Sequence, residues 1–240
     1  DEQAAAVPTR VLVAGAGIAG LAMANALSRI GGFEVELVDP DPRPVGVAVG
    51  LSSCALRALD GIDVLEPVLA ASAPSMALHM CTADGTTLVH TVRETPEGQP
   101  YPDNVIVDRL SLAGALAASV MARGVRIRTG VAAAGIELVD GGAIVDLVAG
   151  VDGGRSGAGA RSGADERPGA GAPVGADRGS GEATTRERFD LVVGADGIGS
   201  RLRASVFAQQ PRDLEQLGLR WTTGPVEGLD HGIMYLAPHA

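Results

Sequence analysis

Three glycines near the start of the chain, Gly15, Gly17 and Gly20, follow a short apolar strand and open an alanine-rich helix. A second apolar strand comes after this helix and ends at Asp39. In this pattern the first glycine permits a tight turn, the second lets backbone N–H groups approach a pyrophosphate, and the third lets the helix pack closely. An acid at the end of the second strand can accept hydrogen bonds from ribose hydroxyls. These residues therefore predict a dinucleotide site.

The same residues restrict the kind of dinucleotide. The unpaired N–H groups and the positive dipole end of the helix favour phosphates. The carboxylate of Asp39 suits a free ribose diol and would repel a 2′-phosphate, which argues against NADP in this pocket. NAD and FAD share the same ADP half, and the motif does not separate them. The alternative is a glycine-rich buried turn that binds no ligand.

The composition is that of a globular protein. The chain has 240 residues, of which 46% are hydrophobic and 20% charged, enough for one large or two small domains. The net charge is −10, and all the basic residues other than histidine are arginines. Such an acid excess disfavours nucleic acids and anionic membranes as partners.

The cysteines and histidines indicate neither a disulfide framework nor a metal site. Cys54 and Cys81 lack metal-ligand or Cys-x-x-Cys spacing, and the four histidines are scattered along the chain. No apolar run is long enough to cross a bilayer. We therefore expect a cytoplasmic protein with reduced cysteines, no bound metal and no membrane span.

The segment after Asp39 departs from an uninterrupted Rossmann domain. It is rich in turn residues, and residues 52–59 and 64–71 then favour short helices. Residues 76–92 favour a hairpin, which indicates a second layer inserted into the nucleotide domain. Further along, the pattern predicts strands at 105–108, 125–128, 189–194 and 232–236, helices at 110–123 and 201–207, and a hairpin of residues 135–139 and 143–148.

Residues 150–188 have a different composition from the rest of the chain. They are rich in glycine and contain no Leu, Ile or aromatic residue. Such a segment buries too little apolar surface to offset its ordering entropy. We predict a disordered loop that extends a hairpin.

A second candidate binding residue is Asp196. It directly follows the strand predicted at residues 189–194, so its carboxylate is expected at the carboxyl edge of the sheet, where α/β proteins bind ligands. The alternative is an Asp-Gly turn or a helix cap.

Three stretches together resemble the FAD-dependent aromatic hydroxylases, the single-component flavoprotein monooxygenases similar to p-hydroxybenzoate hydroxylase. They are the glycine motif with Asp39, the sequence Val-Asp-Arg-Leu at 107–110, and the pattern Gly-Ala-Asp-Gly-x-x-Ser-x-x-Arg at 194–203. The first motif is shared by many folds, and the third is much narrower. Apart from the low-complexity segment, the resemblance extends from residue 10 to residue 207.

The resemblance implies a cofactor site composed of Gly15, Gly17, Ile18, Ala19, Gly20, Asp39, Arg43, Arg109, Asp196 and Gly197. The glycine loop would bind the FAD pyrophosphate and Asp39 the adenosine ribose. Arg109 would approach the cofactor from the opposite wall, and Arg43 precedes the family's second glycine-rich turn. Asp196 and Gly197 belong to a stretch that serves both FAD and a transient pyridine nucleotide.

The implied activity is hydroxylation of an aromatic or polyketide-like small molecule. NADPH or NADH would reduce FAD, and the reduced flavin would capture O2 as a C4a-hydroperoxide that hydroxylates an electron-rich ring. The flavin carries the difficult step while the protein supplies position and excludes water. No catalytic acid or base can be nominated from the sequence.

The implied fold class is α/β: a Rossmann-like FAD-binding fold with an inserted β-rich substrate layer. A later Gly-Asp motif of the family is not found before Ala240, so we expect a chain truncated at its C-terminus. The predicted parts are residues 1–74 (FAD-binding domain, first part), 75–104 (substrate layer, first part), 105–210 (FAD-binding domain, second part, with the insert 150–188) and 211–240 (incomplete substrate layer).

The sequence leaves three other functions open. The first is a catalytically inactive dinucleotide-binding remnant or interaction module, which the missing Gly-Asp motif favours. The second is a flavin reductase or halogenase on the same nucleotide domain. The third and weakest is an NAD dehydrogenase, because no β-α-β continuation follows Asp39 at the usual spacing.

Overall fold

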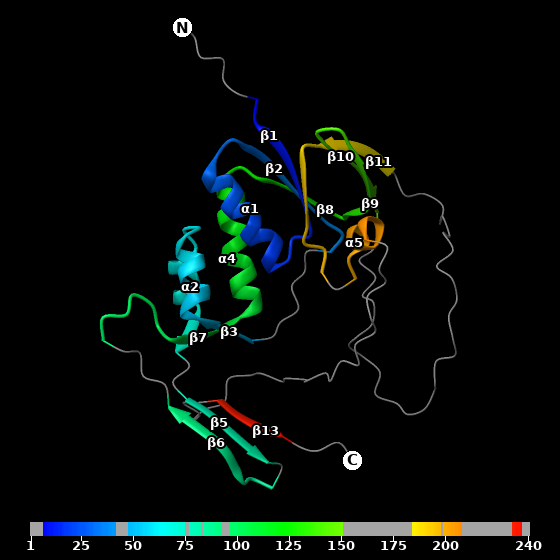
Figure 1. Ribbon diagram of the computed structural model, residues 1–240. Helices are drawn as coiled ribbons and strands as arrows, with labels where there is room; N and C mark the ends of the chain where they lie inside the picture. The colour runs from blue at the N-terminus through cyan, green and yellow to red at the C-terminus, as the bar shows by residue number, and fades with distance from the viewer. Residues whose placement is uncertain are drawn as a thin grey trace, which may run out of the picture.

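The computed structural model describes residues 7–41, 48–74, 77–82, 84–92, 97–150, 184–197, 199–207 and 232–236 (Figure 1). Its centre is a parallel sheet with the strand order β12-β1-β2-β8. The strands are β1 (Thr9–Ala14), β2 (Phe33–Asp39), β8 (Arg126–Thr129) and β12 (Leu191–Gly194). Helix α1 (Ile18–Ile30) connects β1 to β2, and helix α4 (Arg109–Ala122) leads into β8.

The two faces of the parallel sheet are covered by different layers. Val11, Val13 and Leu37 are buried against α1 and α4, whose inner sides contribute residues such as Leu21 and Leu116. The intervening β1 residues and Val38 of β2 are buried in a second apolar cluster on the opposite face, against a three-stranded antiparallel sheet. This two-sided burial explains the continuous apolar run of β1. The predicted Rossmann-like α/β class is therefore confirmed.

The antiparallel layer is formed by β9 (Val131–Val139), β10 (Gly142–Ala149) and β11 (Thr184–Phe189), in the order β11-β10-β9. The hairpin predicted from the Asp-Gly-Gly turn is confirmed, with Gly141 at a φ of 69°. The first strand of this hairpin begins earlier than predicted, because residues 131–133 are buried against the parallel sheet.

The prediction of a disordered segment at residues 150–188 is wrong for its last part, because residues 184–188 belong to β11. Thr184 pairs with Val148 and Phe189 pairs with Ala143 across β10 and β11. The outward-facing Arg186 forms ion pairs with side chains of β9 and β10, so charged pairing replaces apolar burial on that face. A composition averaged over the whole segment concealed this strand. Residues 151–183 lie outside the described residues.

The buried strand predicted at residues 189–194 is also different in the structure. Phe189 ends β11, Asp190 lies in a bend, and only residues 191–194 join the parallel sheet. Among the described strands β12 lies at the edge of that sheet, and Leu191 is exposed. Strand β12 is therefore only partly buried, since it has a described neighbour on one side alone.

Two further three-stranded sheets complete the described chain. One consists of β3 (Ala48–Ser52), β7 (Asn104–Asp108) and β4 (Ser72–Pro74), and its core residues join those of α2 (Ser53–Asp60) and α3 (Leu65–Ala70). The other consists of β13 (Gly232–Leu236), β5 (Ala77–Thr82) and β6 (Thr87–Val92). The hairpin predicted at residues 76–92 is confirmed by the antiparallel pairing of β5 with β6. A short helix, α5 (Arg201–Val206), follows β12.

The division into FAD-binding and substrate parts stays a prediction, because the strand pairing does not define domain boundaries. Arg43 lies outside the described residues. In the described part of the chain, none of the helices combines the length and apolar character that spanning a bilayer requires.

A partly buried ion-pair group joins the parallel sheet to the antiparallel layer. Nη1 of Arg128 on β8 donates to Oε1 of Glu36 on β2 at 3.2 Å and to Oε1 of Glu187 on β11 at 2.8 Å. The hydrogen bond to Glu187 is the largest cause of the raised pKa of Arg128. The three side chains are between 14% and 28% exposed, so water screens this group less than the outer ion pairs.

Replacing Arg128 by Met should lower the free energy of unfolding by about 1–3 kcal/mol, because two half-buried carboxylates lose their common cation. The matched control is Arg186→Met, which removes an arginine whose side chain is 57% exposed. That variant should change the unfolding free energy by less than about 1 kcal/mol. Urea unfolding of both variants measures the difference, and equal losses would show that Arg128 does not tie the two sheets together.

Candidate functional site

The loop between β1 and α1 is held in a conformation that only glycine accommodates easily at its first position. Gly15 has a φ of +108°, and its N–H donates to the backbone oxygen of Val38 at 2.8 Å. A Cβ atom at this position would lie 2.3 Å from the backbone oxygen of Ala195. The predicted tight turn at Gly15 therefore also serves a backbone contact with the loop after β12.

The other two glycines of the motif have opposite surroundings. A Cβ at Gly20 would lie 1.8 Å from the backbone oxygen of Gly15, so this glycine lets the first helical turn close on its own loop. At Gly17 nothing lies within 4 Å of such a Cβ. Gly17 therefore leaves its backbone open to a ligand.

The first turn of α1 offers a favourable site for an anion. No side chain caps this helix, and its first turn contains no acidic residue. Ile18 is half-buried and packs against the core, while Ala19 is exposed. Because the helix dipole places partial positive charge here, the exposed backbone can bind phosphate oxygens.

Asp39 lies at the carboxyl end of β2, beside this loop. Its Oδ2 accepts a hydrogen bond from the N–H of Ala16 at 2.6 Å, and its Oδ1 accepts one from the N–H of Asp41 at 2.7 Å. The side chain is half-buried. The structure therefore places the predicted ribose acceptor within hydrogen-bonding distance of the predicted phosphate loop.

Arg109 is brought to the same edge by the parallel packing of α1 and α4. Both helices run against the direction of the parallel strands, because α1 connects β1 to β2 and α4 leads into β8 (Figure 1). Nδ2 of the fully buried Asn25 on α1 donates to the backbone oxygen of Leu116 on α4 at 3.0 Å. Asn25 lies as many residues after the start of α1 as Leu116 lies after the start of α4. The helix starts at Ile18 and Arg109 therefore lie at one level.

The start of α4 leaves the Arg109 side chain available. Asp108 caps the helix by accepting a hydrogen bond at Oδ2 from the N–H of Ser111 at 3.1 Å. The Arg109 side chain is exposed, and its guanidinium forms no hydrogen bond or ion pair within the part of the chain that the structure describes. It can therefore turn toward a bound anion.

The third motif is attached directly to the first. The N–H of Ala195 donates to the backbone oxygen of Ala14 at 2.7 Å, which continues the pairing of β12 with β1. Oδ2 of Asp196 accepts the N–H of Arg201 at 2.9 Å and the N–H of Leu202 at 3.4 Å. The helix-cap alternative for Asp196 is thus present in the structure, beside its position at the carboxyl edge of the sheet.

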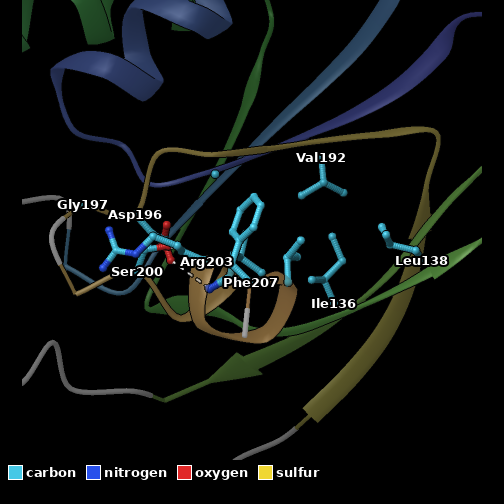
Figure 2. Close-up of a pocket in the computed structure, with 11 residues that line it drawn as sticks. Ile136, Leu138, Val192, Asp196, Gly197, Ser200, Arg203 and Phe207 are labelled. Atoms are coloured by element: carbon cyan, nitrogen blue, oxygen red, sulfur yellow. Dashed lines mark hydrogen bonds between the residues drawn. The ribbon is translucent and has the colours of Figure 1, made fainter. Parts of the chain in front are cut away.

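A pocket of about 480 Å³ opens beside the third motif. Figure 2 shows Asp196, Gly197, Ser200 and Arg203 at one end of it. The other walls are apolar side chains of β9, β12, α5 and the residue that follows α5, namely Ile136, Leu138, Val192, Leu202, Val206 and Phe207. The turn at Asp196 and Gly197 therefore lies between the glycine loop and this largely apolar pocket. Ala195, the residue before the turn, makes the contact with the glycine loop.

Most of the predicted cofactor residues thus gather at one edge of the parallel sheet. The glycine loop, Asp39, Arg109 and the Asp-Gly turn at 196–197 follow or face strand ends there. Sequence reasoning missed Ala195, which contacts Gly15 through its backbone. The available signal was its small side chain between a glycine and an acid, and that signal alone does not identify the partner loop.

The comparisons with known proteins agree with this architecture. Residues 13–53 match the family model described as an NAD(P)-binding Rossmann-like domain. The chain is 30% identical over 203 residues to the phenazine 1,6-dicarboxylic acid hydroxylase PhzS of Lysobacter antibioticus, covering 83% of this chain and 43% of that protein. It is 41% identical over 96 residues to the kynurenine 3-monooxygenase of Salinispora tropica, covering 35% of this chain and 21% of that protein.

A solved structure gives the same relationship. The tetrameric form of 2-methyl-3-hydroxypyridine-5-carboxylic acid oxygenase is 26% identical, with a TM-score of 0.58 over 83% of this chain and 42% of that chain. The chain spans less than half the length of these relatives. The fold and motifs define a Rossmann-like nucleotide-binding protein. The relatives confirm the more specific resemblance, and the chain is related to the FAD-dependent aromatic hydroxylases.

Replacing Gly15 by Ala should lower the free energy of unfolding by about 2 kcal/mol or more, since the new Cβ would meet a backbone oxygen and φ is positive. The matched control is Gly114→Ala on the exposed side of α4, where nothing lies within 4 Å of an added Cβ. The control should be unchanged or more stable by about 0.5–1 kcal/mol. If thermal unfolding showed equal stability for both variants, the described contact between the two loops would be wrong.

Proposed function

We propose that the chain provides the nucleotide-binding part of an FAD-dependent monooxygenase that uses NAD(P)H and O2 to hydroxylate a small aromatic compound. The observation that carries the proposal is that an open glycine loop, a carboxylate bonded to that loop and an available arginine lie at one sheet edge. These groups come from three separate stretches of the chain.

The residues present fit the ADP half of FAD. Gly17 leaves room for a diphosphate beside the uncapped start of α1. Asp39 uses one acceptor position on each carboxylate oxygen for backbone N–H groups, and a carboxylate offers about four positions. Two ribose hydroxyls can therefore still donate to Asp39.

Arg109 supplies the positive charge that the diphosphate requires. The chain carries a net charge of −10, so a cofactor anion meets an unfavourable overall charge. A guanidinium at the level of the α1 start can form charge-assisted hydrogen bonds to phosphate oxygens. Backbone N–H groups and this arginine together would outweigh the more distant acids, which salt screens.

When bound, FAD would supply the redox chemistry of reduction by NAD(P)H and oxygenation of the substrate. The chain's own residues would hold and orient it. The turn at Asp196 and Gly197 is joined to the pyrophosphate loop through Ala195, so its backbone would lie next to the cofactor. We include NADPH or NADH as the transient electron donor and a cytoplasmic location in the same proposal.

The proposed substrate class follows from the relatives. Two of them are named for aromatic carboxylic acids, phenazine 1,6-dicarboxylic acid and 2-methyl-3-hydroxypyridine-5-carboxylic acid. We therefore propose a planar aromatic compound that carries an acidic group. No residue of this chain is assigned as a catalytic acid or base.

The test is FAD binding to the purified chain, followed by flavin absorbance and fluorescence. The chain should bind FAD, and Gly17→Ala should weaken binding by roughly tenfold or more, because a methyl group would stand where the backbone meets the diphosphate. The same variant should lose no more than about 1 kcal/mol of stability, since φ is −72° and no neighbour is close. Gly114→Ala is the control, and its affinity should be unchanged.

Chain that folds but never binds FAD would reject the proposal and favour an inactive remnant or interaction module. If FAD binds, NADPH should bleach the flavin absorbance, and an aromatic acid should accelerate that reduction. A flavin that neither NADPH nor NADH reduces would contradict the monooxygenase assignment while leaving FAD binding in place.

A further inference from the structure

The Asp39 carboxylate connects two backbone turns at the carboxyl edge of the sheet. One oxygen accepts the N–H of Ala16, in the middle of the glycine loop, at 2.6 Å. The other accepts the N–H of Asp41, two residues further along its own chain segment, at 2.7 Å. Both bonds have the short lengths of charge-assisted hydrogen bonds.

The bond to Ala16 acts at the most constrained point of the phosphate loop. Ala16 is buried and stands between Gly15, whose φ is positive, and Gly17, whose backbone faces open space. Its N–H donates to Oδ2 of Asp39. Without an acceptor this buried N–H would be unpaired, and the loop would favour other conformations.

We infer that Asp39 is a positioning residue, which orders the glycine loop before a dinucleotide arrives, as well as a ribose acceptor. This inference rests on the proposed function, because the ordered loop matters as a cradle for the ADP half of a cofactor. A loop that is already ordered loses less conformational freedom when the ligand binds, and affinity rises accordingly. Asp39 therefore contributes to affinity even for a ligand that has no ribose hydroxyl.

A ligand cycle separates the two contributions. The probes are ADP and 2′,3′-dideoxy-ADP, which carries the same diphosphate and adenine without the hydroxyls. Asp39→Ala should bind ADP more weakly than the unaltered chain does, and it should also bind the dideoxy compound more weakly, by about tenfold. The control is Glu34→Ala, which removes an exposed acid from the same strand and should alter neither affinity.

Amide hydrogen exchange of the unliganded chain tests the ordering directly. The N–H groups of Ala16 and Asp41 should exchange slowly in the unaltered chain and about tenfold or more faster in Asp39→Ala. Asp39→Asn keeps one acceptor oxygen, so one of the two amides should stay protected. If Asp39→Ala does not fold, Asp39→Asn and the unaltered chain still allow this comparison.

The outcomes are distinguishable from a failure of the proposed function. Equal binding of dideoxy-ADP by the unaltered chain and Asp39→Ala would reduce Asp39 to a ribose acceptor and overturn the inference. An Ala16 amide that exchanges as fast as the exposed Ala19 amide in the unaltered chain would overturn it independently of any ligand. If the unaltered chain binds neither ADP nor FAD, the proposed function fails, and the exchange experiment still decides whether Asp39 orders the loop.

Discussion

The close backbone packing of two loops at the carboxyl edge of the parallel sheet is the constraint on which the rest of the site depends. Gly15 approaches Ala195 so closely that no side chain fits between them, and the N–H of Ala195 donates to Ala14. This contact exists because β12 pairs with β1 in parallel, so both strands end at the same edge. This contact fixes the loop that precedes α1 and places Asp196 beside that loop.

Charge is distributed in a way that suits this site. The chain as a whole is acidic, yet the start of α1 has no acid in its first turn, and Arg109 stands at the same level on α4. Asp39, which lies beside the loop, is bonded to two backbone N–H groups. These hydrogen bonds partly compensate its negative charge, so a local anion site can exist within an acidic protein.

Local patterns predicted the parts of this architecture that depend on neighbouring residues. The glycine spacing gave the turn and helix start, Asp39 was placed at a strand end, and the Asp-Gly-Gly turn gave the hairpin of β9 and β10. What could not be predicted depends on contacts between distant segments. Strand β11 was hidden in a glycine-rich composition because Arg186 and Glu187 are stabilised by charges on other strands. The Ala195 contact and the Asp39 bond to Ala16 have no periodicity that a sequence could reveal.

We propose that this edge of the sheet holds the ADP half of a flavin cofactor. A crystal structure of the chain soaked with ADP tests it most directly. We expect diphosphate density against the backbone of Gly17 and Ile18, and a ribose whose hydroxyls lie within hydrogen-bonding distance of the Asp39 carboxylate. ADP bound elsewhere, or a cleft at this edge closed by side chains with no room for the nucleotide, would contradict it.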